Sequence, residues 1–177
     1  MIATDRLDIA PWTHDDVDRL YDTYSRWEVA RWLGATPRAL ADPAEAPSVV
    51  DRWAARCVGF LGVWAVRVRA TGVIAGTVLL VPLPSTGDGD QVEVSWHLHP
   101  DSWGHGYATE AAAGAIAHGF AHGLTEIFAV VRPGNERSIA VCHRLGMTPL
   151  GRTTRWYDTD LVAFRTGARG ASTVRPE

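Results

Sequence analysis

The chain has 177 residues, of which 46% are hydrophobic and 21% charged, and its formal net charge is −3. This length suits one globular domain, and no apolar run approaches the roughly 20 residues that a helix needs to cross a bilayer. The net negative charge argues against nonspecific nucleic-acid binding, which depends on many cations. The first residues lack the basic region and apolar run of a secretory signal, so we expect a cytoplasmic protein.

Charge is unevenly distributed along the chain. Residues 1–110 contain 15 acidic residues and 9 arginines, whereas residues 111–177 contain 8 arginines and 5 acidic residues. A cationic substrate would favour the first part, and ordinary variation of a solvated surface is the alternative explanation. Cys57 and Cys142 lie far apart and outside any C-x-x-C pattern, so they indicate two buried thiols rather than a disulfide framework or a zinc site.

The first third of the chain predicts one strand followed by helices. Residues 6–9 alternate as a half-buried strand, and Thr13 is expected to cap a helix that has acidic residues in its first turn. Apolar residues then recur at helical spacing, at Val17, Leu20, Tyr21 and Tyr24. Further helices are expected over residues 27–33 and 48–60.

The remainder alternates between strands and helices. Strands are expected at residues 63–68, 73–81 and 91–98, with a loop rich in turn residues at 82–90. A helix over 106–122, a strand over 127–131 and a helix over 136–145 follow, the last ending at Gly146. Two more strands are expected at 148–156 and 161–165. This order predicts a single mixed α/β domain over residues 1–166, followed by a disordered tail at 167–177.

Residues 93–110 carry most of the chemistry. A strand runs there into a turn with Gly104 and Gly106, and the turn opens a helix. Glycines let the backbone approach an anion closely, and the free N–H groups at the positive end of a helix favour phosphate. Glycines that merely make a tight connection between strand and helix are the alternative reading.

The same stretch resembles the acetyl-CoA-binding signature of the GNAT superfamily, in particular the branch containing the ribosomal-protein N-terminal acetyltransferases. The opening Thr4-Asp5-Arg6-Leu7 also resembles the start of these proteins, and the similarity covers roughly residues 3–165. The residues at the positions of this pattern are Glu93, Val94, Ser95, Trp96, Leu98, Pro100, Trp103, Gly104, Gly106, Tyr107, Ala108, Thr109, Glu110, Ala111, Asn135, Ser138, Leu145, Gly146 and Met147.

This resemblance implies a GNAT-like fold, in which the fourth and fifth strands of a mostly antiparallel sheet are parallel and splay apart around the pantetheine arm of acetyl-CoA. It implies that Asn135 and Ser138 face the thioester; the alternative is that Asn135 is only the N-cap of its helix and Ser138 only a hydroxyl in the first turn. The residues implied to bind the cofactor are Trp96, His97, Leu98, Trp103, Gly104, His105, Gly106, Tyr107, Ala108, Thr109, Asn135 and Ser138.

Two positions depart from the pattern of the superfamily. Asp101 stands where the phosphate loop often begins with Gln or Arg, so phosphate binding is expected to depend mainly on backbone N–H groups. Ser95 stands where a glycine is common, so the strand is expected to be kinked differently at that point.

Three side chains are candidates for the chemical step, which needs a neutral amine, a donor for the oxyanion and a proton for the thiolate. Glu93 would take the amine proton, directly or through water; an ion-paired or solvated carboxylate is the alternative. Ser138 would steady the sulfur or donate a proton to it, although a hydroxyl is a weak acid. Tyr157 is a second candidate acid, against a packing role beside Trp156.

Aromatic and histidine residues suggest further sites. Trp27, Trp32 and Trp156 are candidates for the acceptor site, against the alternative that they are core residues, as expected for Trp12, Trp53 and Trp64. His97 with His99, and His118 with His122, would each share a face and could supply two metal ligands, but a third ligand is not evident. We therefore expect no metal.

The expected function is acetyl transfer from acetyl-CoA to an amine, by direct attack in a ternary complex. A protein or peptide α-amine is the leading acceptor, because its pKa near 8 leaves roughly a tenth neutral at pH 7, whereas lysine needs more help. The alternatives are a polyamine or aminoglycoside-like acceptor, and a sensor that binds acyl-CoA without turnover. A homodimer is left open.

Overall fold

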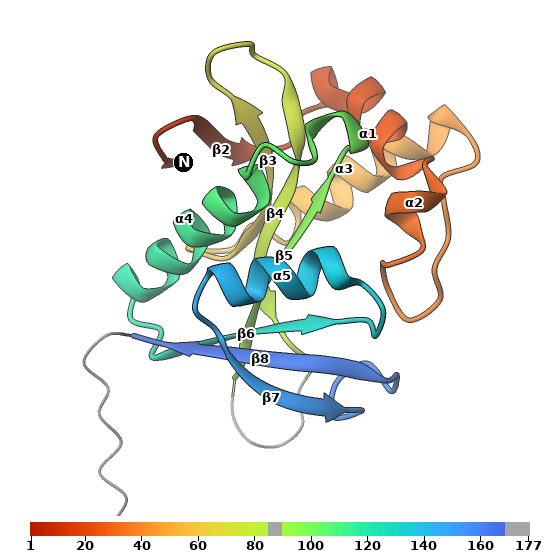
Figure 1. The fold of residues 1–177 in the computed structure, drawn as a ribbon. Coiled ribbons are helices and arrows are strands. Elements are labelled where there is room, and N and C mark those ends of the chain that lie inside the picture. The colour runs from red at the N-terminus through yellow and green to blue at the C-terminus, as the bar shows by residue number, and fades with distance from the viewer. Residues whose placement is uncertain (85–89, 169–177) are drawn as a thin grey trace, which may run out of the picture.

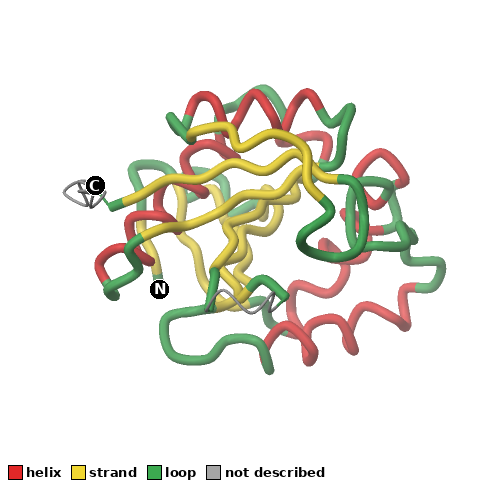
Figure 2. Tube along the Cα trace, turned by 90° about the horizontal axis from the view of Figure 1, so that it is seen from below, coloured by secondary structure: helices red, strands yellow, loops and turns green. Residues whose placement is uncertain are grey.

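The computed structural model describes residues 1–84 and 90–168, which form one mixed sheet of eight strands with helices on both faces (Figures 1 and 2). The strands lie in the order β1-β2-β3-β4-β5-β6-β8-β7. Their bounds are β1 (Ile2–Ala3), β2 (Leu7–Pro11), β3 (Gly62–Val68), β4 (Ile74–Pro82), β5 (Val92–Leu98), β6 (Glu126–Val131), β7 (Thr148–Thr153) and β8 (Leu161–Gly167).

Strands β5 and β6 make the one parallel pair among the described strands, and every other pair is antiparallel. Their pairing consists of a single position, Glu93 opposite Phe128. Beyond Glu93 the two strands diverge, whereas β4 and β5 pair from end to end. The expected mixed sheet with two splayed parallel strands is confirmed. The strands expected as the fourth and fifth are β5 and β6, because the short strand β1 precedes them.

The helices cover the two faces of the sheet unequally. Helix α4 packs on one face, where Ala111, Ala112 and Ala115 are fully buried against the strands. The other face is covered by a second cluster, in which Leu20 and Val50 come from two helices near the N-terminus. The bounds are α1 (Val17–Tyr24), α2 (Trp27–Ala30), α3 (Ala46–Ala54), α4 (Tyr107–Ala121) and α5 (Glu136–Arg144), with 3-10 turns η1 (His14–Asp16), η2 (Pro43–Glu45) and η3 (Pro100–Ser102).

Short polar residues fix where these helices begin and end. The Thr13 N–H and hydroxyl both donate to the Asp16 carboxylate, at 3.2 and 2.8 Å, which stabilises the entry into η1 and α1 as expected. Helix α5 ends just before Gly146, whose φ of +68° is readily adopted by glycine. Both boundaries were therefore readable from local sequence.

Several expected boundaries are wrong. The helix expected over 48–60 is α3, which starts at Ala46 because Asp42 caps the preceding turn, and which stops before Val58 pairs with Leu61. Helix α2 ends at Ala30, not near residue 33. Strand β7 ends at Thr153, not Trp156, because the chain turns there.

The chain ends contribute more structure than expected. Strand β1 precedes the strand expected at residues 6–9, and Gly167, assigned to the tail, belongs to β8. Residues 169–177, expected to be disordered, and the loop residues 85–89 lie outside the described residues. Among the described helices, none is long and apolar enough to cross a membrane.

Candidate active site

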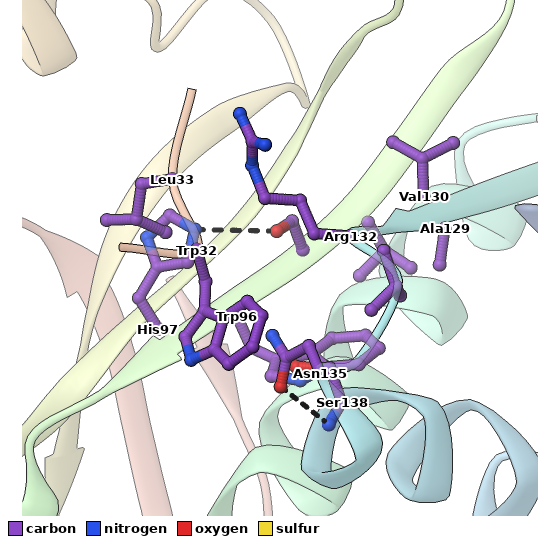
Figure 3. A pocket seen from close by; sticks show the side chains of 12 residues that line it. Trp32, Leu33, Trp96, His97, Ala129, Val130, Arg132, Asn135 and Ser138 are labelled. Carbon is purple, nitrogen blue, oxygen red and sulfur yellow. Dashed lines mark hydrogen bonds between the residues drawn. The ribbon is translucent and has the colours of Figure 1, made fainter. Parts of the chain in front are cut away.

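A cavity of about 50 Å³ lies where β5 and β6 diverge (Figure 3). Residues 94–97 of β5 and 129–132 at the end of β6 form two walls, and Asn135, Ser138, Trp32 and Leu33 complete the lining. A larger cleft of about 1190 Å³ shares Trp32, Leu33, Asn135 and Ser138 with this cavity and continues to the start of α4. The splayed strands and the glycine turn therefore border the same space.

The glycine turn has a conformation that favours glycine at two positions. Gly104 and Gly106 have φ values of +82° and +81°, and both line the cleft. A Cβ atom built at Gly104 would meet no other atom within 4 Å, so the backbone there is open to an approaching ligand.

Six successive backbone N–H groups, those of residues 104–109, donate to no protein acceptor within the described residues. The first amide of the segment with a partner is that of Glu110, which donates to Gly106 O at 3.1 Å. Unpaired amides at the N-terminus of a 15-residue helix form a positive site suited to phosphate. This donor set fits the diphosphate of the implied cofactor, and Arg137 and Arg144 also line the cleft.

Most residues expected to bind the cofactor line the cleft. His105 does not: its ring stacks on Tyr107, with 5.4 Å between centroids, and its carbonyl accepts a hydrogen bond from Arg6. The expected residues that line the cleft are Trp96, His97, Leu98, Trp103, Gly104, Gly106, Tyr107, Ala108, Thr109, Asn135 and Ser138.

Asn135 and Ser138 combine the two roles considered for them. Asn135 Oδ1 accepts a hydrogen bond of 3.3 Å from the Ser138 N–H, as a helix cap does (Figure 3). Both residues also line the cavity and the cleft. The Ser138 hydroxyl has no hydrogen-bond partner within the described part of the chain, so it is available to a ligand.

Glu93 and Tyr157 are in direct contact. The Tyr157 hydroxyl donates a hydrogen bond of 2.7 Å to Glu93 Oε1, and the Glu93 residue is only 7% exposed. Tyr157 and Asp158 have φ values of +65° and +46°, a conformation that is unfavourable for a bulky side chain and frequent at functional sites. Glu93 does not line the 50 Å³ cavity, but its neighbour Val94 does.

Burial governs the protonation of this pair. Burial raises the pKa of Glu93 to about 7, against smaller opposing effects of the Tyr157 hydrogen bond and the Arg56 charge. The pKa of Tyr157 is raised by its own burial and by the Glu93 charge. Glu93 is therefore a carboxyl group that exchanges a proton near neutral pH, which suits a general base.

His97 forms a second polar contact, which the sequence did not indicate. Its Nδ1 lies 3.2 Å from the Tyr24 hydroxyl, which donates to Thr77 Oγ1 at 2.6 Å, and its Nε2 lies 3.5 Å from Ser95 Oγ. Burial lowers the pKa of His97 to about 4, so the ring is neutral at physiological pH. Thr77 is placed opposite His97 by the β4–β5 register, which no local pattern reveals.

Asp101 is occupied by partners other than a ligand. Both of its carboxylate oxygens accept from Arg19 Nη2, at 2.8 and 2.9 Å, and Ser102 Oγ donates to it at 2.7 Å. Although burial opposes the effect, hydrogen bonds from Arg19, Ser102 and His99 hold the pKa of Asp101 well below its usual range. The acidic residue that departs from the superfamily pattern thus joins the turn to α1.

The three candidate acceptor-site tryptophans lie in different environments. Trp32 lines both the cavity and the cleft, whereas Trp27 is 55% exposed and lines neither. Trp156 is 2% exposed, packs on Phe128 and donates to Gln91. Of these three tryptophans, only Trp32 therefore lies at the site.

Arg132 connects the end of β6 to the segment after α2. Its Nη2 donates to Gly34 O at 2.5 Å and to Ala35 O at 2.8 Å, and its own residue lines the cavity. It thereby ties the segment that carries Trp32 and Leu33 to the strand across the cavity. No sequence signal marked this contact, which spans 98 residues.

Other candidate features lie outside this site. Asp15 and Asp18 are exposed and line neither the cavity nor the cleft, while Asp22 is ion-paired with Arg26 and lies 3.0 Å from His99. Among the described residues, no group of three or more His, Cys, Asp or Glu side chains could hold a metal ion.

Comparisons with known proteins agree with this architecture. A sequence profile described as an acetyltransferase (GNAT) domain matches residues 6–148. An uncharacterized N-acetyltransferase, YoaA of Bacillus subtilis, is 28% identical over 173 residues, which cover 93% of this chain and 96% of that protein.

Two solved structures show the same fold. RimJ of Mycobacterium smegmatis, in complex with CoA-disulfide, aligns with a TM-score of 0.78 at 20% identity and covers 94% of this chain and 84% of its own. Spermidine N-acetyltransferase of Vibrio cholerae, in complex with CoA and spermine, aligns with a TM-score of 0.72 at 12% identity, covering 93% and 96%.

Proposed function

The chain belongs to the GNAT acetyltransferase family and is an acetyl-CoA-dependent acyltransferase, and we propose that its acceptor is the α-amine of a protein or peptide. The observation that carries the proposal is the buried Glu93, whose pKa is raised to about 7 and which lies at the last paired position before β5 and β6 diverge. Within the family, we propose kinship with the ribosomal-protein N-terminal acetyltransferases, on the motifs at residues 4–7 and 103–110.

The strength of the base matches this acceptor. An α-ammonium with a pKa near 8 lies about one unit above Glu93, so proton transfer between them is nearly balanced. A lysine side chain, with a pKa near 10.4, lies more than three units above it. Glu93 therefore suits an α-amine better than a lysine.

Bound acetyl-CoA supplies an activated acetyl group. The amides of residues 104–109 hold its phosphates, and the cavity wall formed by β5 and β6 receives its pantetheine arm. Glu93 accepts the proton of the attacking amine, directly or through water, and the Tyr157 hydroxyl orients the Glu93 carboxylate. The Ser138 hydroxyl, which lines the cavity and has no hydrogen-bond partner among the described residues, is the proposed proton donor to the leaving sulfur, and the proton accepted by Glu93 returns to Ser138 through solvent.

The test is a screen of acceptors by thiol release from acetyl-CoA. Short peptides with free N-termini, polyamines and aminoglycosides are compared by kcat/KM, and mass spectrometry locates the acetyl group. We expect peptides to be the best acceptors, with acetylation at the α-amine. A polyamine or an aminoglycoside as the best acceptor would overturn the α-amine assignment and leave the acyltransferase activity in place. A homodimer stays a prediction that sedimentation analysis tests.

A further inference from the structure

Side chains from two sequence motifs, which the proposed mechanism does not use, meet in the structure although about 100 residues of chain separate them. The Glu110 carboxylate, in the first turn of α4, accepts hydrogen bonds from the Thr4 hydroxyl at 2.6 Å and from the Arg6 N–H at 2.8 Å. The Arg6 guanidinium donates to the other oxygen of Glu110, with Nε at 2.7 Å. The turn before β2 is thus fixed to the start of the helix.

Arg6 also reaches past Glu110 to the glycine turn itself. Its Nη1 donates to His105 O at 3.0 Å, and its guanidinium lies over the Tyr107 ring, 5.0 Å from the ring centre. A Cβ atom built on Gly106 would lie 3.5 Å from Arg6 Nη2. Arg6 therefore lies against the turn without lining the cleft.

The bond to His105 O has a consequence for the next amide. A trans peptide is planar, and its C=O and N–H point in opposite directions. Because Arg6 holds the His105 carbonyl on its own side, the N–H of Gly106 points away from Arg6. Gly106 lines the cleft, and within the described residues this N–H has no protein acceptor.

We propose that Arg6 and Glu110 are a positioning pair, which fixes the peptide between His105 and Gly106 so that its N–H faces the phosphates of acetyl-CoA. The inference rests on the proposed assignment of residues 104–109 as the phosphate-binding turn. In this proposal the pair orients the peptide and does not attract the phosphates by charge, because Glu110 compensates the charge of Arg6.

Three contacts make Glu110 suitable for this task. Partial burial raises the pKa of Glu110, but the hydrogen bonds from Thr4 and Arg6 outweigh this effect and hold the pKa below its usual value. The carboxylate therefore stays ionised at neutral pH. The Glu110 side chain is 17% exposed, against 51% for Arg6. A half-buried, ionised carboxylate with three donors fixes the guanidinium more firmly than solvent does. The turn consequently keeps one arrangement before the ligand binds.

The test compares ligands with and without phosphates. The Kd of CoA is measured by calorimetry for the wild type, Arg6→Gln and Glu110→Gln, and kcat/KM is measured with S-acetylpantetheine, a donor that lacks the diphosphate and the nucleotide. We expect CoA to bind about tenfold more weakly to each variant, with kcat/KM for S-acetylpantetheine unchanged within about twofold. We expect the double variant to lose no more than about the larger single loss, because both substitutions break one unit.

Arg69→Gln is the matched control. Arg69 braces the same N-terminal segment through Thr4 O at 2.9 Å and Asp5 O at 3.0 Å, but none of its described hydrogen bonds goes to α4. The Arg69→Gln substitution should lower the melting temperature without changing CoA affinity. Wild-type CoA affinity in folded Arg6→Gln and Glu110→Gln, or an equal loss with S-acetylpantetheine, overturns the positioning role. If the phosphates of CoA contribute nothing to binding even in the wild type, the assignment of residues 104–109 as the phosphate-binding turn is wrong.

Discussion

The Tyr157 hydroxyl and Glu93 Oε1 lie 2.7 Å apart, although 64 residues of chain separate the two residues. This hydrogen bond places a phenol beside a buried carboxylate on the strand that borders the cavity. It opposes the effect of burial and lowers the pKa of Glu93, so it tunes the proposed base toward neutrality.

We expect Glu93→Gln to lower kcat by about 100-fold at pH 7, because a proton acceptor is lost while the shape is kept. In the wild type, kcat/KM should rise as pH increases through about 7, where Glu93 ionises, and this contribution should be absent from the variant, in which the rise from ionisation of the acceptor amine near pH 8 remains. CoA affinity, measured by calorimetry, should stay within about twofold. Equal turnover of both proteins from pH 6 to 9 would make Glu93 a structural residue.

Tyr157→Phe should move the pH dependence rather than abolish activity. Removal of the hydrogen bond that lowers the pKa of Glu93 leaves the carboxyl protonated to higher pH. We expect kcat/KM to fall several-fold at pH 7 and to recover by about pH 9, with the rising limb displaced to higher pH. A uniform loss at every pH would instead indicate a role in packing or in acceptor binding. The Glu93→Gln, Tyr157→Phe double variant should match Glu93→Gln, since the phenol acts through the carboxylate.

Gly104→Val and Gly106→Val should remove the increase in melting temperature that CoA gives the wild type, because the new side chains disturb the turn whose amides bind phosphate. Gly123→Val is the matched control, since Gly123 also has a positive φ, +94°, and an unobstructed Cβ direction, but it follows α4 at its other end. Thermal shift measurements with and without CoA separate the two effects. Folded Gly104 and Gly106 variants that keep the full CoA shift would contradict the assignment.

His97 should make the protein sensitive to acid. Its pKa is about 4 in the fold and about 6.5 in the unfolded chain, so the unfolded chain binds more protons between these values and the free energy of unfolding falls as pH drops. We expect His97→Asn to reduce the stability difference between pH 7 and pH 5 by up to about 2 kcal/mol in urea titrations. His14→Asn, which removes a histidine side chain that is 60% exposed, is the control. An unchanged difference in His97→Asn would show that the ring is protonated equally well in both states.

The acidic residues Asp15, in η1, and Asp18, in α1, provide a test of substrate charge. Asp15 and Asp18 are exposed, so Asp15→Asn with Asp18→Asn should leave the fold intact and raise KM for a cationic peptide about two- to threefold at low salt. The increase should disappear above about 0.3 M salt. Asp22 is left unchanged because it already pairs with Arg26. A KM that is independent of both the substitutions and the salt would make these carboxylates an ordinary solvated surface.

Sequence reasoning succeeded where one local segment determines the structure. The Thr13 cap, the glycine turn at 104–106 and the glycine after α5 each depend on residues close in the chain. The mixed sheet and the splayed parallel strands followed from the resemblance, which spans most of the chain. Glu93 and Tyr157 were both selected, but nothing in the sequence indicated that they touch.

The features that were missed depend on long-range pairing. His97 meets Tyr24 and Thr77 only because β4 and β5 pair in one register and α1 packs over them. Arg132 reaches Gly34 across 98 residues, and Arg6 reaches His105 across 99. A register or a helix packing angle is set by the sum of many core contacts, so no short motif specifies it.

The single pairing of β5 with β6 divides the sheet mechanically into two panels, β1 to β5 and β6 with β8 and β7. The ladder hydrogen bonds that would join the panels stop at Glu93 and Phe128, and side-chain packing against α4 and α5 joins the rest. A ligand lying between β5 and β6 would contact both parts of the sheet and hold them together. Hydrogen exchange in β5 and β6 should therefore slow when CoA binds, while exchange in the fully paired β3 and β4 should change little.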